Sequence, residues 1–407
     1  MIHIFNDLQA RKIVKDITNE EKFLTLKKDD GVYVGFDPTA SSLHLGNYVQ
    51  IITLKRFQKQ GFKSIGLVGG ATGMIGDPSG KNSERNLLSN DEIIFNKNKI
   101  SRQLKSFGLE VIDNYDWWKN VSIIDFLRDI GKLLNINYMI QKDSVKSRLE
   151  TGISFTEFSY QLIQGWDFNW LYDHNNVKMQ IGGSDQWGNI TSGLEIIRKE
   201  KGENNALGLT INLLTTSLGK KFGKSENNAV WLDSELTTPY EMYQYLLNTT
   251  DEDVEKMLMW LTFLEVDQIL EIVRNHLEDP KKRYAQKKLA TEVVNDIHGI
   301  DEMKNIEVIN DVLFNGGDIK SLTSVQLENI SGIVPCLETC ETNIVEILVD
   351  TKVASSKRDA RELIIGNAIS INGQKIVNID YEYKIEENNK KYSILKKGKK
   401  KFFVIKH

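Results

Sequence analysis

The stretch from Phe36 to Asn47, with the sequence FDPTASSLHLGN, contains groups that could bind a phosphate. A strand-like run over residues 32–37 stops at Pro38, and a helix is expected to begin near His44. A helix that follows a strand presents unpaired backbone N–H groups and the positive end of its dipole at the sheet edge, where an anion is stabilised. The four residues HLGN alone also fit a histidine that merely caps a helix, so the motif needs structural context.

Two glycine-containing segments supply cations. Residues 69–85, GGATGMIGDPSGKNSER, match neither the Walker pattern nor the dinucleotide fingerprint, but their glycines permit close backbone approach and they hold Lys81 and Arg85. Residues 220–225, KKFGKS, provide Lys221, Lys224 and Ser225. A surface loop with solvated charges is the alternative reading of the first segment.

Polar side chains also gather around a third expected strand, over residues 177–181. In the helix before it, Tyr160, Gln164 and Asp167 are spaced i, i+4 and i+7 and therefore project from one face. After the strand comes GGSDQWGN, residues 182–189, where a carboxylate beside two glycines suits a pair of ribose hydroxyls. An exposed polar helix face is the alternative for the first group.

The elements that would position these groups form an α/β pattern. Strands are expected over residues 32–37, 64–68, 177–181 and 207–214, with a helix over 48–60 that ends at Gly61. Strand, helix and strand in this order predict a parallel Rossmann-like sheet whose ligand lies at the carboxyl ends of its strands. Residues 1–28 are expected to form one or two helices. Residues 91–159 are expected to be a helical insertion with Trp117, Trp118 and Phe155 among its anchors.

The second half of the chain has the pattern of a helical region followed by a small region of helices and strands. Residues 238–312 are expected to be almost entirely helical, and residues 313–343 to be a linker with some local structure. A short capped helix over 355–366 precedes two strands that flank Asn372-Gly373, a type I′ hairpin signal. The expected fold class is thus α/β with a helical insertion, followed by an all-α domain and a small α+β domain.

Charge is distributed unevenly along the 407 residues, of which 40% are hydrophobic and 27% charged. Residues 345–407 hold fourteen lysines and arginines against eight carboxylates, a net of +6, which leaves −10 for the rest of a chain whose total is −4. A basic tail on an acidic body favours a polyanionic partner bound by one end, although lysines guarding an edge strand would look similar. Cys336 and Cys340 are expected to be free thiols, since two cysteines alone make no zinc site. With no apolar run of about 18 residues and no signal-like start, no membrane contact and a cytoplasmic location are expected.

Five motifs in this order and at these spacings carry a resemblance to a known family. HLGN, GGATGMIGDPSGKNSER, SFTEFSY, QIGGSDQWGN and KFGKS together resemble the bacterial-type tyrosyl-tRNA synthetases over essentially the whole chain. The resemblance implies a class I catalytic domain over 1–225, with a dimer-forming insertion at about 91–159. It also implies a helical anticodon-binding domain over 226–320, a linker over 321–343 and an S4-like RNA-binding domain over 344–407.

The resemblance also implies roles for single residues. Tyr33 and Asp167 match the residues that bind the phenol hydroxyl of tyrosine, Asp77, Tyr160 and Gln164 those around its ammonium group, and Gln186 a residue beside the substrate. Thr39 and His44 match γ-phosphate contacts, and Lys81, Arg85, Lys221, Lys224 and Ser225 match groups that gather on pyrophosphate. The remaining ATP contacts are implied at Gly35, Asp37, Gly46, Asn47, Gly183 and Asp185. Two departures are Asn47, where a second histidine is commoner, and Trp166, where tyrosine is usual and which we interpret as packing.

The implied chemistry agrees with this set of residues. The tyrosine carboxylate attacks the α-phosphorus of ATP to give tyrosyl-adenylate and pyrophosphate, and the tyrosyl group then passes to the 3′ end of tRNA(Tyr). A carboxylate is ionised at neutral pH, so no general base or covalent enzyme intermediate is needed, and positioning with charge stabilisation suffices. The expected cofactors are ATP as substrate with Mg²⁺ bound to it, with no structural metal. A homodimer is expected from the resemblance.

Two alternative functions are compatible with parts of the sequence. A tryptophan-activating enzyme shares the fold, but the pair Tyr33 and Asp167 and the S4-like tail argue against it. An RNA-binding protein on an inactive scaffold belongs to a different class. The retained phosphate-binding set, which includes His44, Lys81 and Lys224, argues against that reading, because an inactive scaffold has no physical reason to keep such cations together.

Overall fold

The computed structural model describes the chain except for a set of residues spread along it. Those left out are residues 1, 81–87, 147, 150–151, 218, 220–221, 224–228, 316–321, 324–325, 327–329, 331–333, 384–391, 399–400 and 407, together with the side chains of 2 and 315. The described chain divides into two compact units. Unit 1 comprises Met1–Thr237 and Leu247–Glu292, and unit 2 comprises Thr238–Leu246 and Val293–His407.

A six-stranded sheet in the order β1-β6-β5-β2-β3-β4 is the centre of unit 1. Strands β2 to β6 run parallel, and β1 pairs antiparallel with β6 at one edge. The strands are β1 (Val14–Ile17), β2 (Gly31–Phe36), β3 (Lys63–Val68), β4 (Glu110–Asp113), β5 (Val177–Gly183) and β6 (Leu207–Ile211). The expected parallel Rossmann-like sheet is therefore confirmed.

The strand order reverses between β2 and β5. From β2 the chain proceeds outward to β3 and β4, whereas from β5 it proceeds the other way to β6. The two strands are paired in register, with Tyr33 opposite Gln180 and Val34 opposite Ile181. In an open parallel sheet this reversal leaves a crevice at the carboxyl ends of the two strands. Asp37 and Ser184, which follow β2 and β5, therefore emerge beside the same crevice.

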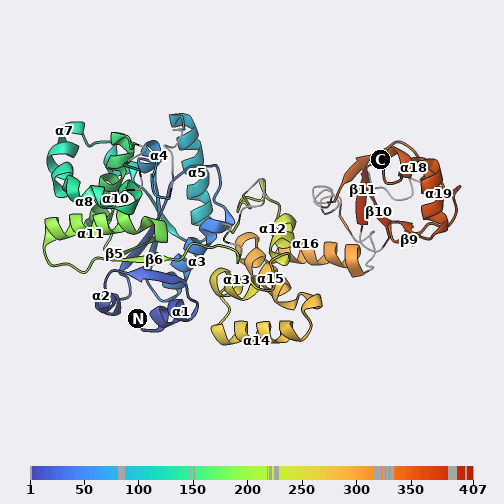
Figure 1. The fold of residues 1–407 in the computed structure, drawn as a ribbon, viewed down its shortest axis with the longest axis horizontal. Helices are drawn as coiled ribbons and strands as arrows, with labels where there is room; N and C mark the ends of the chain where they lie inside the picture. The colour runs from blue at the N-terminus through green and yellow to red at the C-terminus, as the bar shows by residue number, and fades with distance from the viewer. Residues whose placement is uncertain are drawn as a thin grey trace. The chain divides into compact units, whose positions relative to one another are not determined.

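Helices cover both faces of this sheet (Figure 1). Helices α3 (Leu45–Lys59) and α5 (Asn90–Ser106) lie on one face, and α10 (Phe155–His174) and α11 (Trp187–Lys201) lie side by side on the other. Helices α10 and α11 approach closely because Gly165 and Gly193 face each other. A Cβ at Gly165 would lie 3.2 Å from the backbone N of Gly193. The other described helices of residues 1–237 are α1 (Ile2–Ala10), α2 (Glu20–Thr25), α4 (Thr72–Ile75), α6 (Tyr115–Trp118), α7 (Ile123–Asp125), η1 (Phe126–Ile130), η2 (Gly131–Leu133), α8 (Ile136–Ile140), α9 (Asp143–Lys146) and η3 (Ser184–Gln186).

Two sequence expectations about this unit were wrong. Residues 1–28 include strand β1 as well as two helices, and the region 91–159 is interrupted by strand β4. Both are four-residue strands at the edges of the sheet, and in both most residues are partly or fully exposed. An edge strand with sequence VKDI or EVID buries too little apolar surface to show the alternation that identifies a half-buried strand. Two further bounds differ by only a few residues, since β6 ends at Ile211 rather than residue 214 and α3 begins at Leu45 rather than residue 48.

Residues 238–312 are helical, as expected. The helices are α12 (Pro239–Leu247), α13 (Val254–Leu261), α14 (Val266–Glu278), η4 (Pro280–Lys282), α15 (Tyr284–His298) and α16 (Ile300–Asn310), followed by η5 (Asp311–Asn315). Within unit 1, Arg11 and Arg56 donate to backbone oxygens at the end of α13. Arg11 reaches the Leu264 carbonyl at 2.7 Å, and Arg56 reaches the Thr262 carbonyl at 2.7 Å. Cations there stabilise the negative end of the helix dipole.

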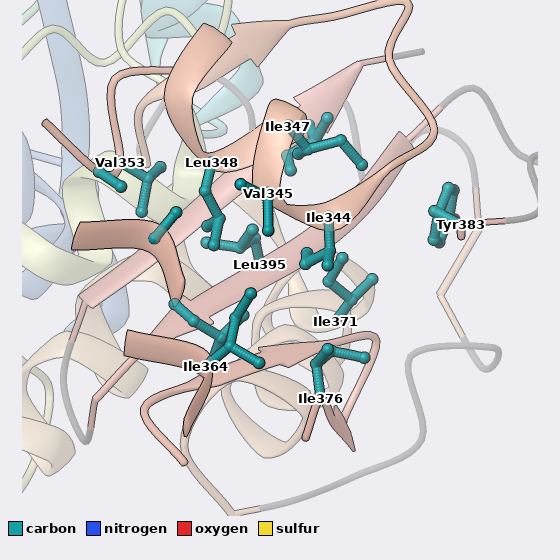
Figure 2. Packing of buried hydrophobic residues seen from close by; sticks show 14 residues of the cluster. Ile344, Val345, Ile347, Leu348, Val353, Ile364, Ile371, Ile376, Tyr383 and Leu395 are labelled. Carbon is teal, nitrogen blue, oxygen red and sulfur yellow. The ribbon is translucent and has the colours of Figure 1, made fainter. Parts of the chain in front are cut away.

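The C-terminal part of unit 2 has its own sheet, in the order β7-β11-β10-β8-β9. Its strands are β7 (Cys336–Glu338), β8 (Ile369–Ile371), β9 (Gln374–Lys375), β10 (Tyr392–Lys397) and β11 (Lys401–Lys406). Helices α18 (Ile344–Asp350) and α19 (Lys357–Ile365) pack their apolar side chains against it (Figure 2). The type I′ hairpin is confirmed, because Asn372 and Gly373 both have positive φ, 49° and 80°, and Ile371 pairs with Gln374.

Candidate functional site

A cavity of about 540 Å³ opens at the carboxyl ends of β2 and β5. Thirteen of the residues singled out in the sequence line it: Tyr33, Gly35, Asp37, Thr39, His44, Gly46, Asn47, Asp77, Tyr160, Gln164, Asp167, Asp185 and Gln186. Gly183 lies next to this set, because a Cβ there would be 2.6 Å from Asp185 Oδ1. Lys81, Arg85, Lys221, Lys224 and Ser225 lie outside the described residues.

The wall formed by the start of helix α3 holds the HLGN motif. His44 is the N-cap, with extended backbone angles, and its backbone N–H donates to Asn47 Oδ1 at 3.1 Å. Asn47 thus closes the first turn of the helix and leaves its amide nitrogen to donate elsewhere. Gly46 is required here, since a Cβ would lie 2.9 Å from the His44 ring. The N-terminal N–H groups of α3 give this wall the partial positive charge that favours phosphate.

Asp167, on helix α10, also lines the cavity and is 1% exposed. Three side chains donate to its carboxylate: Asn114 Nδ2 to Oδ2 at 2.9 Å, and the indole N–H groups of Trp117 and Trp118 to Oδ1 at 2.9 Å and 2.7 Å. Burial raises the pKa of Asp167 to about 7, against the opposing effect of the three donors. Because these donors occupy Asp167, it is held as an acceptor with a fixed orientation.

Tyr33 is fully buried on β2 and its ring is tilted by 59° against that of Phe168, with ring centroids 5.5 Å apart. Its hydroxyl oxygen has no hydrogen-bond partner within the described chain. Burial, with the nearby Asp167 charge, keeps the pKa of this phenol well above its usual range, so the hydroxyl stays protonated. A buried hydroxyl without a partner costs free energy, which a ligand with a matching polar group would recover.

A second polar cluster is centred on two buried or half-buried aspartates. Asp77 accepts from Gln186 Nε2 at 2.6 Å, Asn189 Nδ2 at 3.2 Å and the backbone N of Ser79 at 2.9 Å. Asp37 accepts from the Tyr160 hydroxyl at 2.8 Å and from Thr72 Oγ1 at 2.7 Å. Burial and the charge of Asp37 raise the pKa of Tyr160 well above its usual range. This part of the cavity lining is therefore acidic, which suits an ammonium group.

Two family models match successive parts of the chain. A family described as "tRNA synthetases class I (W and Y)" matches residues 26–314, and one described as "Tyrosine--tRNA ligase SYY-like C-terminal domain" matches residues 326–405. The tyrosine–tRNA ligase of Mycoplasmopsis synoviae is 50% identical over 414 residues, covering 100% of both chains. That of Ureaplasma urealyticum is 49% identical over 411 residues, covering 100% of this chain and 99% of its own. The chain belongs to the tyrosine–tRNA ligase family.

Membership establishes tyrosine–tRNA ligase activity of class I, with ATP, tyrosine and tRNA(Tyr) as substrates. The crystal structure of a C-terminally truncated mitochondrial tyrosyl-tRNA synthetase from Aspergillus nidulans is similar, with a TM-score of 0.69 and 32% identity over 76% of this chain and 94% of its own. The structure of an Archaeoglobus fulgidus tyrosyl-tRNA synthetase has a TM-score of 0.56 at 15% identity, covering 74% of this chain and 99% of its own, which supports the fold alone. Within the described residues, no helix is long and apolar enough to cross a membrane. Nor is there a cluster of three or more His, Cys, Asp or Glu there that could hold a metal.

Several residues that shape this tyrosine–tRNA ligase site were missed in the sequence. They are Thr72, Asn114, Gln180 and Asn189, and also Trp117 and Trp118, which the sequence indicates only as apolar anchors of the insertion. The two tryptophans instead donate to Asp167, and Trp117 stacks on Trp170 at 4.1 Å between ring centroids. The overlooked strand β4 explains part of this. Residues 114–118 follow its carboxyl end, so recognising β4 would have placed them beside the other ligand-binding loops.

Proposed function

We propose that tyrosine and ATP bind to different sets of residues in the cavity. Tyr33 and Asp167 bind the phenol hydroxyl of tyrosine, and Asp77, Tyr160 and Gln164 surround its ammonium group beside Gln186. Thr39 and His44 contact the triphosphate, and Gly35, Asp37, Gly46, Asn47, Gly183 and Asp185 contact the nucleotide. The observation that carries this proposal is the unpartnered Tyr33 hydroxyl next to a buried carboxylate in a cavity that also holds the start of α3.

We propose that Lys81, Arg85, Lys221, Lys224 and Ser225 complete the phosphate site, on the basis of their sequence motifs. Charge that develops on the pyrophosphate as the α-phosphorus is attacked would then be stabilised by these cations and by the helix end. Neither step requires a nucleophile from the enzyme, because a carboxylate attacks first and a ribose hydroxyl of tRNA attacks second. Mg²⁺ is proposed to enter bound to the ATP phosphates, where it neutralises part of their charge.

We also propose the domain functions that the family resemblance implies. Residues 1–225 are the catalytic domain, 226–320 the anticodon-binding domain and 344–407 an S4-like domain that binds tRNA. The net charge of +6 over residues 345–407 supports the last assignment, because lysine and arginine neutralise RNA phosphates. The expected linker over 321–343 needs one correction, because its residues 336–338 form strand β7 of the C-terminal sheet. The exposed side chains of Cys336 and Cys340 are thiols and not a disulfide, which supports a reducing, cytoplasmic location.

A truncation separates the two steps of the proposed reaction. Strand β7 pairs with β11, so the cut belongs before residue 334, which removes both strands together. We expect the chain without residues 334–407 to retain tyrosine-dependent ATP–pyrophosphate exchange, while kcat/KM for tRNA charging falls about tenfold or more. Exchange should stop in both proteins when EDTA exceeds Mg²⁺. Unchanged charging by the truncated protein would refute the role of the tail.

A homodimer is proposed through the insertion. Exposed apolar side chains are concentrated there, on short helices and at the start of α10: Ile123, Ile124, Leu127, Ile136 and Phe155, each 49% to 68% exposed. Exposed apolar groups gathered in one region of a chain mark an interaction surface. Light scattering from the purified protein is expected to give twice the chain mass. The mass of a single chain at micromolar concentration would contradict the proposal.

A further inference from the structure

Side chains on one face of helix α5 form hydrogen bonds with the turn that joins β2 to α3. Residues 38–44 contain no regular helix or strand, yet they carry Thr39 near one end and His44 at the other. At the first end, Asn96 Nδ2 donates to the Pro38 carbonyl at 3.2 Å. At the second end, Gln103 Oε1 accepts from the backbone N of Leu43 at 2.9 Å. Two side chains of one helix therefore fix the residue before Thr39 and the residue before His44.

Gln103 forms a second hydrogen bond with the same turn. Its Nε2 donates to Ser42 Oγ at 2.8 Å, and Ser42 is only 3% exposed. Ser42 Oγ also accepts from the backbone N of Asp233 at 3.2 Å, and the Leu43 carbonyl accepts from the backbone N of Leu232 at 2.8 Å. Residues 42–43, which precede His44, are thus hydrogen-bonded both to α5 and to residues 232–233.

Helix α5 is suited to act as a rigid support. Asn96, Lys99, Ile100 and Gln103 follow the spacing i, i+3, i+4 and i+7, so they lie on one face. On that face Ile100 lines the cavity, and Lys99 Nζ lies 3.6 Å from Asp233 Oδ2 and 3.2 Å from Glu235 Oε2. The same helix is packed on the sheet, where Leu104 is fully buried against Gly66.

We propose that Gln103, assisted by Asn96, is a positioning residue that sets the place of His44 and Thr39 against the triphosphate of ATP. The inference rests on the proposed function, because it acts through residues assigned there to the phosphates. Gln103 contacts no substrate. It fixes the backbone from which His44 projects, and misplacement of such a group by even a fraction of an ångström costs rate in a reaction that depends on positioning.

The expected effect is on the chemical step and not on tyrosine binding. Gln103→Ala should slow tyrosyl-adenylate formation in single turnover by about tenfold or more, while the Kd for tyrosine changes by less than about twofold. Gln103→Glu keeps an oxygen that accepts from Leu43 N–H and should recover most of the lost rate. The matched control is Gln58→Ala, which removes a glutamine side chain that donates to the Gly108 carbonyl at 2.7 Å on the same unit. The control should leave both quantities unchanged.

A double-mutant cycle with His44→Ala tests whether Gln103 acts through His44. If it does, Gln103→Ala in the His44→Ala background should slow adenylate formation by less than about twofold. Independent, multiplicative losses would overturn the inference, as would a rate for Gln103→Ala equal to that of Gln58→Ala. The cycle also distinguishes a failure of the proposed role of His44 from a failure of the role of Gln103. If His44→Ala alone had no effect, the proposed role of His44 would fail, whereas a slow His44→Ala with a normal Gln103→Ala would refute the positioning role only.

Discussion

Asp167→Ala is expected to lower kcat/KM for tyrosine in ATP–pyrophosphate exchange by at least about 100-fold, because the phenol loses its hydrogen-bond partner in a buried site. The variant also leaves Asn114, Trp117 and Trp118 without their common acceptor. Binding of ATP should change far less, since the ATP contacts proposed at the start of α3 do not involve Asp167. Equal tyrosine-dependent exchange in variant and parent would rule this role out.

Two further variants show whether a loss of exchange comes from the missing side chain or from a loss of folding. Asp173→Ala removes another carboxylate of α10, one that pairs with Lys201 at 2.7 Å, and should leave exchange unchanged. Tyr33→Phe removes a buried hydroxyl that has no partner within the described chain, so stability should hold or rise. Activation of tyrosine should nevertheless fall relative to phenylalanine. A stability loss in Tyr33→Phe comparable to that of Asp167→Ala would contradict this account of the Tyr33 hydroxyl.

The second large effect is on stability as a function of pH. The pKa of Asp167 is about 7 in the folded protein and near 3.8 in the unfolded chain. Between these values the folded state holds a proton that the unfolded state has released, so this group's contribution to stability falls as pH rises. At 1.4 kcal/mol per pKa unit, a difference of about three units corresponds to about 4 kcal/mol.

Asp167→Asn removes this titration while keeping the size of the side chain. We expect the free energy of unfolding of the parent to fall relative to that of the variant by up to about 4 kcal/mol between pH 4 and pH 8. Urea unfolding at several pH values measures the difference, and contributions from other titrating groups cancel between the two proteins. A difference that stays constant with pH, or that changes in favour of the parent, would contradict the raised pKa.

Local sequence patterns were sufficient where the site is built from single elements. The spacing of Tyr160, Gln164 and Asp167 places all three on one face of α10, and all three line the cavity. The start of α3 at HLGN and the carboxyl end of β5 likewise follow from a strand, a turn and a helix read in order. In each case the information lies within about ten residues of sequence, where helix and strand periodicity operates.

The contacts that orient these residues could not be predicted in the same way. Gln103 and Leu43 are 60 positions apart, and Trp117 and Asp167 are 50 apart, so no local period links them. Both pairs depend on which faces of which helices pack together. Strand β4, which brings Asn114 and Trp117 to the site, is a short, mostly polar edge strand that leaves little hydrophobic pattern.

Tyr33 and Asp167 are proposed to recognise a phenol selectively, so ATP–pyrophosphate exchange should be measured with each of the twenty amino acids. We expect tyrosine to support rapid exchange. Phenylalanine leaves the buried Tyr33 hydroxyl without a partner and offers no donor to Asp167, at about 1–3 kcal/mol for each lost interaction, so its kcat/KM should be lower by about 30-fold to about 10⁴-fold. Exchange with tryptophan or phenylalanine at a rate comparable to tyrosine would contradict the account.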